Sequence, residues 1–249
     1  MGAKPGKKGK PVKPPKPRAV VVVFAKAVVA GQVKTRMRPV LQAAEAADLY
    51  RALLLDTLEA VRATDAEAVV AFTPANGRSS LERLLGRRWP LVAQGPGDLG
   101  ERLESVFAQL HASSKRPLIA IGSDCPGVTP ARLREAFAAL DTHAAVLGPA
   151  LDGGYYLLGL TAPRRELFRD ISWSTADVAA VTQERLGRAG VSLALLPAER
   201  DLDTPADLLD WYTAAHAGAL RATYARTWAM VSAVLPPRRL AALEEAAAR

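Results

Sequence analysis

The residues best suited to chemistry lie in a short loop between an apolar segment and a helical pattern. The apolar segment, residues 20–24, is rich in valine, which predicts a buried strand. The loop after it supplies five candidate nucleotide-binding residues: Lys26, Gly31, Lys34, Thr35 and Arg36. Backbone N–H groups at such a junction can point at oxygen anions, and the Lys and Arg side chains add positive charge. The loop matches neither the P-loop nor the GxGxxG pattern, so an ordinary surface turn is the alternative.

A second candidate is the loop GPGD, which follows a short predicted strand. Gln94, Gly95 and Gly97 could receive a nucleotide base there. The glycines permit close approach, and the amide offers both a donor and an acceptor. Asp98 belongs to the same group of candidate nucleotide-binding residues, although it could instead cap the next predicted helix.

Two more acidic residues come at or after the ends of predicted strands. Asp124 ends the apolar run RPLIAIGSD, and Asp152 follows the run HAAVLGPAL. Asp152 could bind a hydroxyl group or act as a general base. Gly153 and Gly154 come next, and two glycines allow a ribose or an acceptor to lie against the backbone.

The elements that must position these residues alternate along the chain. The predicted strands span residues 20–24, 66–74, 89–94, 116–127, 143–150, 152–160 and 191–197, and the predicted helices span 41–63, 79–85, 99–112, 131–140 and 172–190, with a last one ending at 216. This order predicts an α/β fold of three layers, with a mainly parallel sheet and helices on both faces. Ligands in such folds bind at the carboxyl ends of the strands, where the candidate loops fall.

Composition divides the chain into a tail and a body. Residues 1–18 contain seven of the 33 basic residues and no acid, so the body carries 26 basic against 25 acidic residues and has no global basic field. We therefore expect no specific nucleic-acid partner. The predicted organisation is a disordered Lys/Pro-rich tail over 1–18, a catalytic domain over 19–216 and a helical extension over 217–249. The extension could cover the core or mediate a homodimer.

The expected compartment is the cytoplasm. A single cysteine, Cys125, excludes an intrachain disulfide and fits a reducing environment. No apolar run approaches the ~20 residues that span a membrane. The apolar run near the N-terminus ends at Lys26 and is short for a signal peptide.

Six motifs in order resemble one bacterial family. They are FAKAVVAGQVKTRMRP, QGPGDLGERL, GSDCPGVTP, GPALDGGYYLLGL, ISWST and DLDTPADL. Together they resemble the rSAM/selenodomain-associated transferase, or glycosyltransferase, family of the nucleotide-diphospho-sugar transferase superfamily, which has the glycosyltransferase-A fold. They are also similar to 2-phospho-lactate guanylyltransferase and, more distantly, to molybdenum cofactor guanylyltransferase. The resemblance covers residues 19–212. It departs from the family where this chain has Val28 and Val29 in place of a frequent proline.

The resemblance implies a metal site and an acceptor site. Asp124 and Asp203 match the aspartates that hold Mg²⁺ or Mn²⁺, an ion that needs only one or two protein carboxylates. The alternatives are a helix-start acid for Asp124, and for the second motif a helix cap made by Thr204 and Asp207. The implied acceptor-binding residues are Asp152, Gly153, Gly154, Tyr155, Trp173, Ser174 and Thr175. Trp173 could instead belong to the core, and Ser174 could be an N-cap.

The implied activity is transfer from a nucleotide to a small-molecule acceptor, with Lys34, Arg36, Asp124 and Asp152 as catalytic residues. The family name favours a metal-dependent glycosyltransferase that uses a nucleotide-sugar donor. The alternative is a guanylyltransferase-like nucleotidyltransferase that joins a nucleoside triphosphate to a small phosphorylated acceptor and releases pyrophosphate. A non-catalytic nucleotide-binding protein is the third hypothesis.

Overall fold

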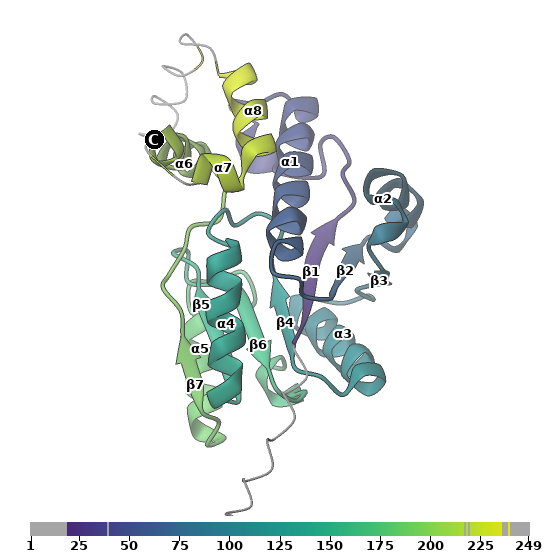
Figure 1. The fold of residues 1–249 in the computed structure, drawn as a ribbon, viewed down its shortest axis with the longest axis vertical. Coiled ribbons are helices and arrows are strands. Elements are labelled where there is room, and N and C mark those ends of the chain that lie inside the picture. Colours follow the sequence, from purple (N-terminus) through teal and green to yellow (C-terminus); the bar gives the residue numbers. More distant parts are fainter. Residues whose placement is uncertain (1–18, 39, 217, 219, 236–238, 240–249) are drawn as a thin grey trace, which may run out of the picture.

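A sheet in the order β3-β2-β1-β4-β6-β5-β7 forms the centre of the described part of the chain (Figure 1). The computed structural model describes residues 19–38, 40–216, 218, 220–235 and 239, so the predicted tail over 1–18 lies outside the described residues. The strands are β1 (Val20–Lys26), β2 (Ala68–Thr73), β3 (Leu91–Ala93), β4 (Leu118–Ile121), β5 (Ala145–Pro149), β6 (Tyr155–Leu160) and β7 (Leu193–Leu195).

The sheet is mainly parallel, which confirms the predicted fold class. β1 pairs in parallel with β2 and β4, β2 with β3, and β5 with β7. Only β6 runs antiparallel to its neighbours, β4 and β5. Because β6 is reversed, its first residue, Tyr155, lies at the edge of the sheet where the parallel strands end. The strand predicted over 116–127 is shorter than expected, since β4 ends at Ile121 and Asp124 lies in the turn after it.

Helices cover both faces of the sheet, which explains the continuous apolar sequence of β1. The helices of this region are α1 (Ala43–Arg62), α2 (Arg78–Leu85), α3 (Leu99–Ser114), α4 (Pro130–Thr142) and α5 (Val178–Arg188). Val21 and Val23 pack in a cluster with residues of α1, α2 and α4. Val20 and Val22 pack in another cluster with residues of α3 and α5. Alternate side chains of one strand thus belong to two separate cores.

A local capping signal places one helix as predicted and fails at another. The Thr129 side chain accepts a hydrogen bond from Arg132 N at the start of α4. The helix predicted over 172–190 begins only at Val178, with Asp177 at the N-cap position. Ser174 is therefore not an N-cap. Its φ of 66° is left-handed, which interrupts a helix at that residue.

Three further helices, α6 (Pro205–His216), α7 (Leu220–Thr223) and α8 (Ala225–Val234), lie beside α1 (Figure 1). Leu49, Trp211, Tyr224 and Val231 belong to a third buried cluster that joins α1 to these helices. The described part of the C-terminal extension therefore packs on the core of the same chain. None of the helices in the described part is long and apolar enough to cross a membrane.

Candidate functional site

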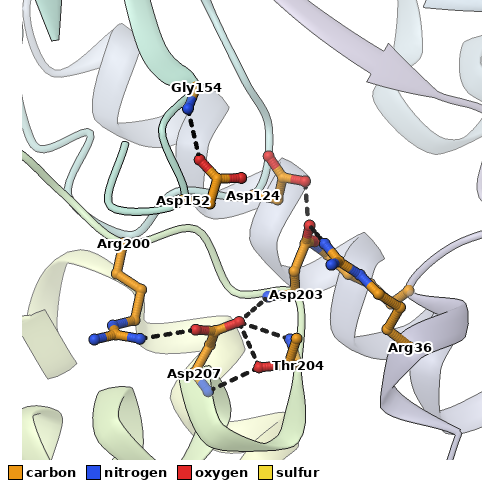
Figure 2. A network of polar contacts seen from close by, with 9 residues as sticks. Arg36, Asp124, Asp152, Gly154, Arg200, Asp203, Thr204 and Asp207 are labelled. Atoms are coloured by element: carbon orange, nitrogen blue, oxygen red, sulfur yellow. Dashed lines mark hydrogen bonds and ion pairs between the residues drawn. The ribbon is translucent and has the colours of Figure 1, made fainter. Parts of the chain in front are cut away.

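Lys34 brings two distant carboxylates together at the carboxyl edge of the sheet. Its Nζ donates to Asp124 Oδ2 at 2.9 Å and to Asp203 Oδ1 at 2.6 Å. Arg36 Nη2 donates to the other oxygen of Asp203, Oδ2, at 2.6 Å. Figure 2 shows Asp124, Asp203 and Arg36 converging from separate segments, with Asp152 nearby. The predicted catalytic residues therefore lie in one place.

Burial and charge act in opposite directions on Lys34. Burial alone lowers the pKa of this lysine, but the Asp124 and Asp203 carboxylates outweigh it and the pKa is raised. Burial likewise acts to raise the pKa of Asp203, and the charges and hydrogen bonds of Lys34 and Arg36 bring it below its ordinary value. Lys34 and Asp203 are therefore both charged at neutral pH. The Lys34 side chain is only 3% exposed, whereas that of Arg36 is 64% exposed, so Lys34 is the stronger constraint on the two acids.

Two buried neighbours and a left-handed residue shape the loop that carries Lys34. Val33 and Met37 are buried on either side of it. Lys34 itself has φ 47°, and its carbonyl accepts from Met37 N at 3.0 Å. The loop is thus anchored by apolar side chains while Lys34 faces the carboxylates. A loop that buries a lysine between two acids is not an ordinary surface turn with solvated charges.

The Asp203 loop is held by the cap predicted as an alternative for this motif. Asp207 Oδ2 accepts from Asp203 N, Thr204 N and Thr204 Oγ1 at 3.2, 2.7 and 2.7 Å (Figure 2). Leu202 N also donates to Asp124 O at 2.9 Å. The Thr204–Asp207 cap and the placement of Asp203 beside Lys34 therefore occur together. A backbone hydrogen bond also joins the loop of Asp203 to the turn of Asp124.

Two adjoining cavities meet at this cluster. The first, of about 410 Å³ and here called the strand-end pocket, is lined by the predicted residues Lys26, Lys34, Gln94, Asp124, Ser174 and Asp203. The second, of about 590 Å³ and here called the loop pocket, is lined by Arg36, Asp152, Gly154, Tyr155, Trp173, Ser174, Thr175 and Asp203. Asp203 and Ser174 line both. Six predicted residues line neither of the two: Gly31, Thr35, Gly95, Gly97, Asp98 and Gly153.

Gln94 is more constrained than the sequence suggests. It is 4% exposed, and its Nε2 donates to Ala71 O at 2.8 Å and Ala25 O at 3.3 Å. The amide donors are thus bound to the ends of two strands, and the amide oxygen is the group left for a ligand. The prediction that this amide offers a donor as well as an acceptor is wrong. Asp98 caps α3, since it accepts from Glu101 N at 2.9 Å.

Gly153 does not line the loop pocket but packs against Ala176, which does. Its φ is 89°, and a Cβ at this position would lie 2.0 Å from Ala176 O. Its carbonyl accepts from Ala179 N at 2.9 Å. Only glycine fits this left-handed contact. Asp152 Oδ1 accepts from Gly154 N at 2.9 Å, and Tyr155 and Trp173 form an edge-to-face pair at 6.4 Å, so the wall of this pocket is built from two loops.

Four residues that the sequence did not single out complete the two pockets. Tyr50 Oη accepts from Lys26 N at 2.7 Å and shares a hydrogen bond of 2.8 Å with Ser123 Oγ. It thereby ties β1 to the turn of Asp124. Arg102 lines the strand-end pocket, and its buried Nε has no partner in the described part of the chain. Arg102 stands within the GDLGERL motif, which was the available signal. Tyr50 lies inside a regular helical pattern and gave none.

Asp201 is the fourth, and it lines the loop pocket. Its Oδ1 is buried without a hydrogen-bond partner among the described residues. Burial, reinforced by the charges of Asp124 and Asp203, raises the pKa of Asp201 to about 7. The site therefore contains one carboxyl group, that of Asp201, that resists ionisation beside that of Asp203, whose pKa is lowered.

The donor set fits a hard divalent cation in part. Carboxylate oxygens are the ligands that Mg²⁺ and Mn²⁺ prefer, and Mg²⁺ takes one or two of them beside substrate phosphates and water. Asp124 and Asp203 could provide these oxygens, and the hydrogen bond from Lys34 to Asp124 uses Oδ2 and not Oδ1 of the aspartate. Within the described residues, no group of three or more His, Cys, Asp or Glu lies close enough to hold a metal without other ligands. A metal here would thus depend on a bound phosphate.

Comparisons with known proteins agree with this architecture. The model of a family described as uncharacterized proteins conserved in bacteria, DUF2064, matches residues 54–175. A 2-phospho-L-lactate guanylyltransferase from Natronomonas pharaonis is 33% identical over 135 residues, which are 54% of this chain and 56% of that protein. The match spans little more than half the length of this curated relative.

Solved structures extend the similarity over the whole fold. A Desulfovibrio desulfuricans protein proposed to be a nucleotide-diphospho-sugar transferase superposes with a TM-score of 0.83 at 28% identity, covering 91% of this chain and 97% of that one. The inositol-1-phosphate CTP transferase from T. maritima superposes with a TM-score of 0.51 at 14% identity, covering 88% and 98%. The chain therefore has the nucleotide-diphospho-sugar transferase-like fold that the motifs implied.

Proposed function

We propose that this protein is a metal-dependent nucleotidyltransferase that joins a nucleoside triphosphate to a small phosphorylated acceptor. The observation that supports this proposal most strongly is the buried Lys34 between Asp124 and Asp203, where the strand-end pocket meets the loop pocket. The similarity to a guanylyltransferase supports this alternative over the glycosyltransferase that the family name favours.

In this proposal the nucleotide occupies the strand-end pocket and the acceptor the loop pocket. An oxygen of the acceptor phosphate attacks the α-phosphorus, and the bond from that phosphorus to the bridging oxygen breaks. Pyrophosphate leaves with the electron pair. Lys34 and Arg36 would neutralise the charge that develops on the phosphoryl oxygens.

A Mg²⁺ or Mn²⁺ ion, when bound by Asp124 and Asp203, would supply charge neutralisation between phosphate groups. Gln94 would accept a hydrogen bond from the base, and Asp152 would orient the acceptor. Arg102 adds to the strand-end pocket a buried Nε that has no hydrogen-bond partner among the described residues. Burying an N–H donor without an acceptor costs free energy unless a ligand supplies the acceptor.

The second candidate is glycosyl transfer, in which the acceptor attacks the anomeric carbon and the nucleoside diphosphate leaves. Its support is the similarity to the Desulfovibrio desulfuricans protein, which covers nearly all of that chain. A purely nucleotide-binding role is disfavoured because Arg36, Asp124 and Asp203 converge around a buried lysine, which simple binding does not need.

The deciding experiment measures the leaving group. The protein with Mg²⁺ is incubated with each nucleoside triphosphate and 2-phospho-L-lactate, and pyrophosphate is assayed. A parallel series uses nucleotide-sugars with simple alcohols and assays nucleoside diphosphate. Acceptor-dependent pyrophosphate supports nucleotidyl transfer, and acceptor-dependent nucleoside diphosphate supports the second candidate. Binding of nucleotides with neither product, across a broad acceptor panel, would contradict both.

A further inference from the structure

The C-terminal helices contact the turn that carries Asp124 through one hydroxyl group. Tyr224 lies between α7 and α8 and is fully buried. Its Oη donates to Cys125 O at 3.0 Å and to Val128 O at 3.1 Å. Cys125 directly follows Asp124, so a residue outside the predicted catalytic domain holds the backbone next to the candidate metal ligand.

The position of Tyr224 is itself fixed by a buried acid on α1. Asp56 is 1% exposed. It accepts from Thr227 N at 2.8 Å and Thr227 Oγ1 at 2.9 Å, and from Arg226 Nη1 at 3.1 Å. Arg226 N also donates to this carboxylate at 3.3 Å. Four hydrogen bonds to Asp56 thus anchor the first turn of α8. Because Tyr224 immediately precedes that turn, its ring cannot shift without disturbing this anchor.

The turn of Asp124 is held from the other side as well. Leu202 N donates to Asp124 O at 2.9 Å, and Leu202 belongs to the loop that carries Asp203. We propose that Tyr224 is a positioning residue of the site: its hydroxyl fixes the turn of Asp124 against the Asp203 loop, so that the two carboxylates face one ligand. The effect on ligand binding rests on the proposed function, and the geometry rests on the hydrogen bonds of Tyr224 and Leu202.

Cys125 gives a direct readout of this turn. It is the one cysteine of the chain and is fully buried. Labelling by a thiol reagent in native buffer therefore requires the turn to open. We expect Tyr224→Phe to label about tenfold faster than the parent, since the variant leaves two buried carbonyl groups without this donor.

A matched control is available in the buried cluster that contains Cys125. Tyr156 is 2% exposed, packs in the cluster that contains Cys125, and donates through its hydroxyl to Pro197 O at 3.1 Å. Tyr156→Phe removes a partly buried hydrogen bond to Pro197 and none to the backbone of the Asp124 turn, so it should label near the parent rate. Both variants are compared at equal distances below their own melting temperatures. Asp56→Asn, which loosens the anchor of α8, should accelerate labelling by a second route.

A binding measurement tests the consequence for the site. Dissociation constants are measured for Mn²⁺ with GTP by electron paramagnetic resonance, which counts the free ion. Tyr224→Phe should weaken Mn²⁺ binding about tenfold, and Tyr156→Phe should not. Equal labelling rates in Tyr224→Phe and Tyr156→Phe would overturn the positioning role. Faster labelling of Tyr224→Phe with unchanged Mn²⁺ affinity would overturn it as well. Faster labelling in a protein whose parent binds no Mn²⁺–GTP would support the geometry and count against the proposed function.

Discussion

Replacing Lys34 with methionine tests the core of the site through stability alone. The substitution keeps most of the side chain's length and removes its charge. It abolishes two charge-assisted hydrogen bonds, to Asp124 and Asp203, whose donor is 3% exposed. Hydrogen bonds to charged groups contribute roughly 1.5–3 kcal/mol each, and removing one partner of a buried ion pair costs about 3–5 kcal/mol.

The two carboxylates are each about a third exposed, so water can solvate them again and the lower part of that range applies. We expect a loss of about 3 kcal/mol in the free energy of unfolding, which for a chain of this size lowers the melting temperature by roughly 6–12 °C. The matched control is Arg36→Met. Its guanidinium is 64% exposed, and an ion pair of that kind contributes about 0–1 kcal/mol.

The assay is urea denaturation at pH 7 in EDTA, followed by a repeat with Mg²⁺. Loss of the ammonium group leaves Asp124 without its cationic partner and Asp203 with Arg36 alone, so Mg²⁺ should restore part of the lost stability in Lys34→Met and little in Arg36→Met. A Lys34→Met variant as stable as Arg36→Met in EDTA would show that the buried pairs of Lys34 do not form, and would refute the reasoning.

Two further variants address the pockets. Arg102→Ala should weaken nucleotide binding by about tenfold or more, because it removes from the strand-end pocket a donor, Nε, that has no partner in the described part of the chain. Calorimetry with GTP and with inorganic tripolyphosphate separates base from phosphate contact, and unchanged affinity for both would remove Arg102 from the site. Asp201→Asn should stabilise the metal-free protein more at pH 8 than at pH 5. The folded-state pKa of Asp201, about 7, lies above its unfolded value, so the parent loses stability as pH rises between about 4 and 7, whereas asparagine does not titrate; equal gains at both pH values in EDTA would contradict the raised pKa.

Local signals in the sequence were sufficient for much of the fold. The valine run of β1 and the cap at Thr129 depend on neighbouring residues, and both are present in the structure. The start of α5 was predicted too early because Ser174 adopts a left-handed conformation. That conformation accompanies the contact between Gly153 and Ala176, which a local pattern does not contain.

The pairing within the site could not be read from the sequence in the same way. Lys34 was predicted as a phosphate ligand and Asp124 and Asp203 as metal ligands, but their mutual contact joins residues separated by 90 and 169 positions. The direction of β6, which brings Tyr155 to the pocket edge, also depends on strand pairing far along the chain. Arg102 lies on α3, where polar and apolar residues alternate at helical spacing, so the sequence does not distinguish it from a surface residue. Only the structure shows that its Nε is buried and has no partner among the described residues.

Asp124→Asn, assayed by thermal shift with nucleotide and Mg²⁺, tests most directly whether this edge of the sheet is a metal-dependent nucleotide site. Asparagine keeps the size and one carbonyl oxygen, so the variant should fold with stability near that of the parent. GTP should stabilise the parent more with Mg²⁺ than with EDTA, and this difference should be largely lost in Asp124→Asn. The control, Asp98→Asn, alters a helix cap that lines neither pocket and should retain the parent's response. An Asp124→Asn protein that keeps the full Mg²⁺-dependent stabilisation would contradict the metal assignment and the proposed transfer chemistry with it.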